Sequence, residues 1–262
     1  MTTTAVETKK MSIAEALRET IREEMRRDES VFCIGEDIGI EGGFGGAFTV
    51  TLGLSDEFGH DRIIDTPISE AGFVGMSVGA AMMGLRPIAD MQYADFLFCA
   101  MDQIVNQMAK MRYMSGGKVK VPMVLRAPGG ATTRAAQHSQ SPESFFIHVP
   151  GIKVVCPSTA YDAKGLLKTA IRSDDPVLFF EHKLLYGSKG MRAEKDALSP
   201  VGEVPVEDYT IPFGKGAIRR ECTDVTIVAK LLMVYKAMEA ANILEKEGIS
   251  CEVIDPRSLV PF

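Results

Sequence analysis

The sequence predicts an α/β protein with a mostly parallel sheet that carries helices on both faces. Short apolar runs rich in β-branched residues, such as residues 31–34, 62–64 and 177–180, alternate with longer segments of helical periodicity. Strands alternating with helices are typical of a parallel sheet whose two faces are covered. Polar and aromatic residues also follow the ends of several strands. Because right-handed crossovers bring the carboxyl ends of parallel strands to one edge, these residues are expected to form a site there.

Each element has its own local signal. Ser12 and Glu15 form a capping-box pattern before a helix whose apolar residues recur at helical spacing. A glycine-rich loop over 39–46 follows the first strand, and Met and other helix-forming residues dominate 98–113. The strands expected are 31–34, 62–64, 87–91, 122–126, 153–155, 177–180, 224–229 and 251–254. The further helices expected are one ending near residue 58 and those over 71–85, 98–113, 162–172 and 236–246.

Four segments are expected along the chain. Residues 1–11 are predicted to be a disordered tail, and 12–187 a single α/β domain. Residues 188–222 lose the periodicity and gain Pro, Gly and charge, which predicts a linker. Residues 223–262 open a second α/β unit. A lone strand–helix–strand unit cannot bury its own faces, so either it docks on the first domain or the chain is a fragment of a longer protein, which is the interpretation favoured here.

Composition excludes several classes of protein. The net charge is −6 and no dense basic block occurs, which argues against a nucleic-acid partner. No apolar run approaches the ~20 residues that a membrane-spanning helix needs. The five cysteines are widely spaced, without a CxxC pair, so neither a disulfide framework nor a zinc site is expected. This pattern, together with the absence of a targeting signal, predicts a cytoplasmic protein.

The stretch 62–76 is the most informative one. A short strand ends in a Pro-containing turn that delivers Glu70 to the start of a helix rich in small residues. The carboxyl group is thereby placed at the ligand-binding edge of the sheet. A glutamate that merely stabilises the helix N-terminus remains the alternative. His138 lies in a polar loop expected at the same edge, where it is a candidate for proton transfer, or else an anchor of that loop.

An ordered set of segments resembles the beta chain of the thiamine-diphosphate-dependent 2-oxo acid dehydrogenases, the family of the pyruvate, branched-chain and acetoin complexes. Any one segment is a weak signal, whereas their order over residues 12–262 is specific. The matching segments are 35–38 (GEDI), 62–72 (RIIDTPISEAG), 78–87 (VGAAMMGLRP), 111–117 (MRYMSGG), 136–141 (AQHSQS), 151–157 (GIKVVCP), 162–166 (DAKGL), 181–186 (EHKLLY) and 251–255 (CEVID). The resemblance implies a transketolase-like pyrimidine-binding domain.

The resemblance also assigns roles to individual residues. Glu70 is expected to hydrogen-bond the aminopyrimidine ring of the cofactor, with a pKa raised by burial. Phe96 matches an aromatic ring that stacks on the pyrimidine, and Tyr93 is its neighbour; a core phenylalanine is the alternative for Phe96. His138 matches a histidine that supports acyl transfer to a lipoyl arm. Glu36 matches an acid at the mouth of the cofactor cleft, although it could equally order the glycine loop.

The implied cofactor is thiamine diphosphate, shared between two chains. No Gly-Asp-Gly segment for the magnesium–diphosphate end occurs here, and in the family that half belongs to an alpha subunit, which also holds Mg²⁺. The resemblance therefore implies a heterotetramer of two alpha and two beta subunits that works with a lipoyl acyltransferase core and is inactive as a single chain. It also implies a potassium ion bound by backbone carbonyls near Ala170, Ser173 and Asp175.

The substrate stays open between pyruvate, a branched-chain 2-oxo acid and acetoin. Residues 138–146 resemble branched-chain members, whereas 156–159 and 181–183 resemble acetoin members. Two other functions are alternatives. A non-catalytic assembly chain is one, although the presence of Glu70 and His138 argues against it. A nicotinamide-dependent oxidoreductase is the other, but the glycine spacing fails because Phe48 stands where the dinucleotide fingerprint needs Gly or Ala.

Overall fold

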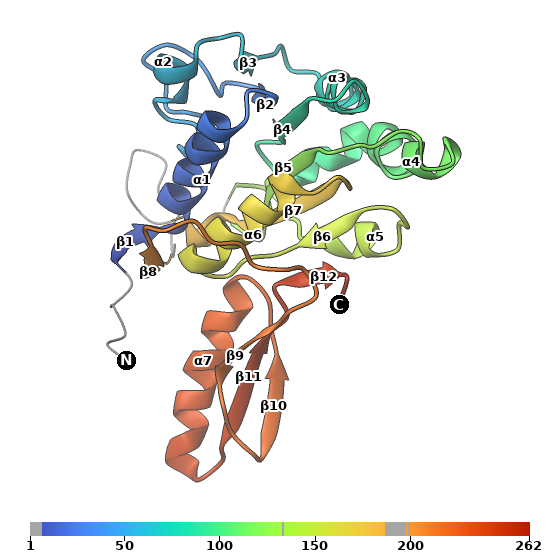
Figure 1. The fold of residues 1–262 in the computed structure, drawn as a ribbon. Helices are drawn as coiled ribbons and strands as arrows, with labels where there is room; N and C mark the ends of the chain where they lie inside the picture. Colours follow the sequence, from blue (N-terminus) through green and yellow to red (C-terminus); the bar gives the residue numbers. More distant parts are fainter. Residues whose placement is uncertain (1–6, 133, 187–197, 199) are drawn as a thin grey trace, which may run out of the picture.

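The computed structural model describes residues 7–132, 134–186, 198 and 200–262. Its centre is a seven-stranded sheet in the order β12-β6-β7-β5-β4-β2-β3 (Figure 1). Every neighbouring pair is parallel except β12 with β6, which confirms the predicted α/β class. The strands of this sheet are β2 (Val31–Gly35), β3 (Ile63–Asp65), β4 (Arg86–Asp90), β5 (Val124–Gly129), β6 (Lys153–Val155), β7 (Val177–His182) and β12 (Ser258–Val260).

Helices cover both faces of this sheet, as expected for buried parallel strands. Successive side chains of a strand point to opposite faces, so Cys33 packs with α1 and α6 whereas Ile34 packs with α3. A continuous helical segment on the α3 face contains a 3₁₀ turn, a wider π turn and one short α-helix, so the helix predicted over 98–113 begins earlier, at Ala94. The helices are α1 (Ile13–Arg27), α2 (Leu54–Phe58), α3 (Glu70–Met82), η1 (Ala94–Ala100), η2 (Gln103–Met108), α4 (Met111–Met114), η3 (Ala136–His138), α5 (Glu143–Ile147), α6 (Ala160–Arg172) and η4 (Lys183–Leu185).

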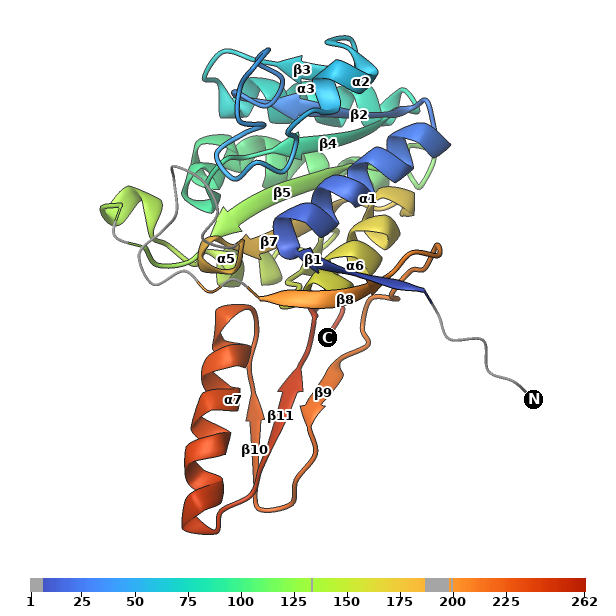
Figure 2. The ribbon, with the colours of Figure 1, turned by 90° about the vertical axis from the view of Figure 1, so that its left-hand side faces the viewer.

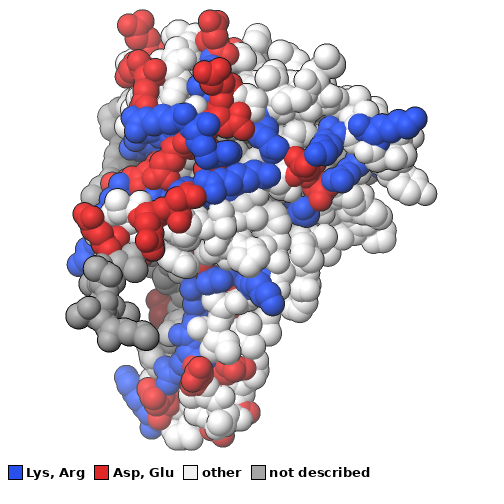
Figure 3. Space-filling model, viewed as in Figure 1, with Lys and Arg blue, Asp and Glu red and all other residues white. Residues whose placement is uncertain are grey.

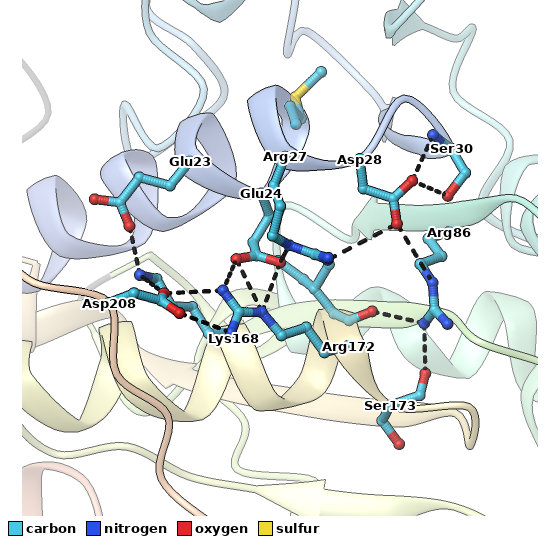
Figure 4. Close-up of polar contacts among 12 residues, drawn as sticks. Glu23, Glu24, Arg27, Asp28, Ser30, Arg86, Lys168, Arg172, Ser173 and Asp208 are labelled. Atoms are coloured by element: carbon cyan, nitrogen blue, oxygen red, sulfur yellow. Dashed lines mark hydrogen bonds and ion pairs between the residues drawn. The ribbon is translucent and has the colours of Figure 1, made fainter.

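Helices α1 and α6 lie side by side on one face of the sheet. The predicted capping box is present, since Ser12 and Glu15 exchange side-chain and backbone hydrogen bonds at the start of α1. Ion pairs join the polar flanks of the two helices, including Glu24 with Arg172 and Glu23 with Lys168 (Figure 4). Figure 3 shows acidic and basic side chains interleaved over this part of the surface.

The N-terminal segment differs from the predicted tail over 1–11. Strand β1 (Thr8–Ser12) pairs antiparallel with β8 (Val201–Pro205), which lies inside the predicted linker over 188–222. The two strands are far apart in the chain, so neither has a local pattern that reveals its partner. Residues 1–6 of the predicted tail, and residues 188–197 and 199 of the predicted linker, lie outside the described residues.

The C-terminal unit is a three-stranded sheet in the order β10-β11-β9 with helix α7 against it (Figures 1 and 2). It comprises β9 (Ala217–Arg220), β10 (Val225–Val228), α7 (Leu232–Leu244), the 3₁₀ turn η5 (Glu245–Glu247) and β11 (Cys251–Asp255). The unit docks on the first domain through β12 and through an ion pair between the partly exposed Arg219 and the buried Asp162. Of the two interpretations offered for this unit, docking on the first domain therefore describes these residues, and it holds whatever the length of the whole protein.

No helix among the described residues combines the length and the apolar character needed to cross a membrane. All five cysteines are free thiols, and three of them are buried.

Candidate active site

The carboxyl ends of the parallel strands meet at one edge of the sheet. There Glu36 follows β2, Asp65 ends β3 and Asp90 ends β4. The ends of β2 and β3 are tied together, since the Thr66 backbone N–H donates to the carbonyl oxygen of Gly35 at 3.0 Å. The expected gathering of polar residues at one edge is thus present.

Two carboxylates are neighbours at this edge. A carboxylate oxygen of Glu36 accepts the backbone N–H of Ser69 at 3.2 Å, and Ser69 immediately precedes Glu70 at the start of α3. Burial raises the pKa of the Glu36 carboxyl, and the negative charge of Glu70 raises it further. Both side chains are half-buried. The Glu36 carboxyl therefore takes a proton more readily than an ordinary glutamate, beside the glutamate that begins α3.

Gln92 connects this pair to the rest of the edge. Its side-chain amide donates to the carbonyl oxygen of Glu36, while its amide oxygen accepts the backbone N–H of Ala47 at 2.8 Å. Gln92 has a φ of +59°, which non-glycine residues seldom adopt. Such a conformation at a site edge is consistent with a functional constraint. Sequence analysis did not single out Gln92, because its importance comes from contacts with a distant loop.

Tyr93, Phe96 and His138 form a second cluster. The His138 ring centroid lies 5.0 Å from that of Tyr93 and 5.4 Å from that of Phe96, both in edge-to-face geometry. Atom Nδ1 of His138 is buried and has no hydrogen-bond partner among the described residues. Three residues proposed from the sequence are therefore in mutual contact. The helical segment η1, which carries Phe96, also packs against α3, which carries Glu70.

His182 is a second histidine at this edge, but its environment is different. Burial lowers its pKa to about 4, and the positive charge of Lys183 acts in the same direction, so its ring is neutral near pH 7. Its Nδ1 accepts the backbone N–H of Leu184 at 3.2 Å. Gly130 has a φ of +92°, and a Cβ atom there would collide with the His182 ring. His182 thus shapes the start of the loop that carries His138.

A buried ion network lies beneath the site. Arg126, on β5, donates to Asp90 on β4 at 2.6 Å and makes a bidentate contact with Glu181 on β7 at 2.6 and 2.8 Å. The hydroxyl of Tyr186 donates to the same glutamate. Three neighbouring strand ends are therefore held in register by one guanidinium, whose fork geometry suits two carboxylates.

The residues predicted for potassium lie elsewhere, at the C-terminal end of α6 and before β7. The carbonyl oxygen of Ala170 accepts the Ser173 N–H at 3.2 Å, and that of Ser173 accepts a bond from Arg86 at 3.0 Å. The carboxylate of Asp175 faces Lys153 at 2.8 Å. The structure does not bring these positions together with the carboxyl-edge clusters. No group of three or more His, Cys, Asp or Glu side chains suited to a metal ion occurs among the described residues.

Comparison with known proteins places the chain in a family. Residues 9–189 match the family described as the transketolase pyrimidine-binding domain, and residues 214–262 match the transketolase C-terminal domain. A solved structure titled as a split-gene transketolase, inactive beta4 tetramer, superimposes with a TM-score of 0.71 at 25% identity. The match covers 96% of this chain and 73% of that one.

Curated relatives are more similar in sequence. The 2-oxoisovalerate dehydrogenase subunit beta of Bacillus subtilis is 48% identical over 253 residues, which are 96% of this chain and 73% of the relative. The subunit beta of acetoin:2,6-dichlorophenolindophenol oxidoreductase from Cupriavidus necator is 50% identical, over 97% of this chain and 74% of the relative. The pyruvate dehydrogenase E1 component subunit beta of Rickettsia felis is 47% identical, over 96% and 73%. The chain belongs to the family of beta subunits of thiamine-diphosphate-dependent 2-oxo acid dehydrogenases, built on transketolase-type domains, as its sequence motifs predicted.

Proposed function

We propose that this chain supplies the aminopyrimidine half of a thiamine diphosphate site whose other half lies on an alpha subunit, and that the assembled enzyme decarboxylates a 2-oxo acid oxidatively. One observation carries the proposal. The carboxylate pair Glu36 and Glu70 adjoins the helical segment that holds Phe96 against His138, at the ligand-binding edge of the sheet.

The donor set fits the pyrimidine half of the cofactor. A carboxyl group at Glu70 would bond a ring nitrogen, and its position beside Glu36, whose pKa is raised, keeps a proton within reach of the pair. Phe96 would offer a ring for stacking, which is worth ~0.5–1.5 kcal/mol beyond burial, and Tyr93 would support it. His138 has an unengaged ring nitrogen for proton transfer during acyl transfer to a lipoyl domain. Thiamine diphosphate, when bound, supplies the electron sink for decarboxylation.

The diphosphate half of the cofactor is assigned to the other chain on the sequence motif alone, since no Gly-Asp-Gly segment occurs here. In this proposal an alpha subunit holds Mg²⁺ and the diphosphate, and two alpha and two beta subunits assemble and deliver the acyl group to a lipoyl acyltransferase core. A potassium ion near Ala170–Asp175 has less support, because the carbonyls of Ala170 and Ser173 already accept hydrogen bonds.

Two substrates are named among the curated relatives reported above. The subunit beta of acetoin:2,6-dichlorophenolindophenol oxidoreductase and that of 2-oxoisovalerate dehydrogenase match this chain at 50% and 48% identity. The first candidate function remains oxidative decarboxylation, with a branched-chain 2-oxo acid or pyruvate as the substrate. Acetoin cleavage is the second candidate function. The nicotinamide-binding alternative has no support from these matches.

Co-expression with an alpha subunit tests the proposal. The chain alone should show no turnover of pyruvate, 2-oxoisovalerate or acetoin with thiamine diphosphate and Mg²⁺, whereas the assembled pair should turn over at least one. Glu70→Gln should leave assembly intact, as judged by size-exclusion chromatography, and reduce turnover to below about a tenth, because an amide can hydrogen-bond the ring nitrogen but cannot exchange a proton with it. Turnover by the isolated chain, or a Glu70→Gln pair that keeps more than about a tenth of the rate, would overturn it.

A further inference from the structure

Asp95 holds the loop that carries His138. This aspartate lies at the start of η1 and is only 5% exposed. Its Oδ1 accepts the backbone N–H of Ser139 at 3.2 Å, the backbone N–H of Gln140 at 3.1 Å and the Gln140 side-chain amide at 3.0 Å. Three donors on one oxygen fix the backbone directly after His138, because hydrogen bonds to a charged acceptor are the stronger kind.

Lys183, which directly follows β7, contacts the same loop. Its side chain is buried, and its ammonium group donates to the carbonyl oxygen of His138. The same ammonium lies 4.0 Å from Oδ2 of Asp95 and 4.8 Å from the centroid of the Tyr93 ring. The charges of Asp95 and Lys183 therefore offset each other. Lys183 contacts the carbonyl of His138 itself, and Asp95 contacts the backbone N–H groups of the next two residues.

The ring of His138 is oriented by the segment that contains Asp95. Tyr93 and Phe96 flank the ring edge-on, one on either side of Asp95 in sequence. Residues 93–96 thus hold both the imidazole of His138 and the backbone directly after it, while Nδ1 has no hydrogen-bond partner among the described residues. A buried ion pair is an expensive way to fill a core, and apolar residues of similar volume would often serve as well. In this protein, the Asp95–Lys183 pair also forms hydrogen bonds with the backbone of residues 138–140, which apolar residues could not do.

We propose that Asp95 and Lys183 are positioning residues that form a two-point clamp on the His138 loop and so set the position of the imidazole. The inference rests on the proposed function, since it supposes that His138 takes part in acyl transfer. A displacement of about 1 Å can cost on the order of 100-fold in rate, so a clamp on the backbone has a large effect without touching substrate.

Kinetics of the complex assembled with an alpha subunit test the clamp. Asp95→Ala should slow reductive acylation of a lipoyl domain by about 10- to 100-fold, with a smaller effect on KM. Asp95→Asn keeps an acceptor oxygen for all three N–H groups but removes the charge that faces Lys183, so it should recover part of the rate lost in Asp95→Ala. In the His138→Ala background, Asp95→Ala should change the rate by less than about twofold, because it acts through the missing ring. Independent losses in the double variant, or equal losses in the Ala and Asn variants, would contradict the clamp.

Hydrogen exchange supplies a readout that does not depend on the role of His138. The Ser139 and Gln140 amides should exchange at least about tenfold faster in Asp95→Ala than in the wild type, and nearly as in the wild type in Asp95→Asn. Asp174→Ala is the matched control, since it removes an ion-paired aspartate at the opposite end of the sheet and should leave these amides unchanged. Unchanged protection in Asp95→Ala refutes the clamp. A different result separates the two claims. If His138→Ala transfers the acyl group normally while Asp95→Ala loses amide protection, then His138 has no role in acyl transfer and the catalytic part of this inference is wrong. The structural contact between Asp95 and the loop would still be established.

Discussion

The two sides of this molecule use the same residue types for opposite purposes. Over the α1–α6 face, carboxylates are paired with cations. Glu24 bonds Arg172 at 2.6 Å, and Asp208 bonds Lys168 at 2.6 Å (Figure 4). At the carboxyl edge of the sheet, Glu36 and Glu70 lie beside each other, and neither forms an ion pair with a cation among the described residues.

The direction of the pKa shifts expresses this difference. Hydrogen bonds from Arg172 and Lys168 hold the pKa of Asp208 well below its ordinary value. Burial and the charge of Glu70 raise the pKa of Glu36. Paired carboxylates favour the folded state, whereas a carboxylate held beside a like charge is typical of a site that exchanges protons. The comparison predicts that changes on the α1–α6 face cost stability and that changes at the edge cost activity.

The largest effect is expected for His138→Ala. Loss of the imidazole should slow reductive acylation of the lipoyl domain by about 100-fold, because general acid–base catalysis contributes on that order. Decarboxylation, measured with an artificial electron acceptor, should fall less, and the free energy of unfolding should change by less than about 1 kcal/mol. Equal losses in both catalytic steps would break the assignment of His138 to acyl transfer.

The second effect is on stability alone. Glu24 is buried and accepts from Arg172 and Arg27, so Glu24→Gln should lower the free energy of unfolding by about 1–3 kcal/mol, as measured by urea denaturation. Glu57→Gln is the matched control. Its pairs with Arg22 and Arg26 are partly exposed and should contribute less than about 1 kcal/mol. Turnover per assembled complex should be unchanged for both variants. A loss of turnover in Glu24→Gln would contradict the expectation that changes on the α1–α6 face affect stability alone.

The smallest effects should have opposite signs. The lowered pKa of Asp208 contributes stability above its ordinary value of 3.8 and loses it as the pH falls through the folded-state pKa. The raised pKa of Glu36 lowers the stability of the folded state as the pH rises past the ordinary value of 4.5, because charging this group costs more free energy in the folded than in the unfolded chain. At pH 7, Asp208→Asn should therefore lower the free energy of unfolding and Glu36→Gln should raise it, each by less than about 1 kcal/mol. Denaturation curves at pH 7 and pH 4 measure both, and shifts of the same sign would show that the pairing argument is wrong.

Much of the first domain was predictable because its signals are local. The capping box at Ser12, the β-branched strands and the placement of Glu70 at a helix start are patterns of adjacent residues, and each is present in the structure. The gathering of strand ends at one edge follows from the handedness of the crossovers. The ordered motifs also identified the family, which the comparisons confirm. The roles assigned to the site residues stay predictions.

Only the tertiary structure decided which distant segments meet. The pairing of β1 with β8 and of β12 with β6 joins residues with no local pattern in common. The Asp95–Lys183 clamp brings together a helical turn, a strand end and a loop, and nothing in those segments alone reveals it. The opposite pKa shifts of Glu36 and Asp208 have the same origin. The sequence determines which groups can be charged, but neighbours and burial, which arise only on folding, determine how strongly each charge is favoured.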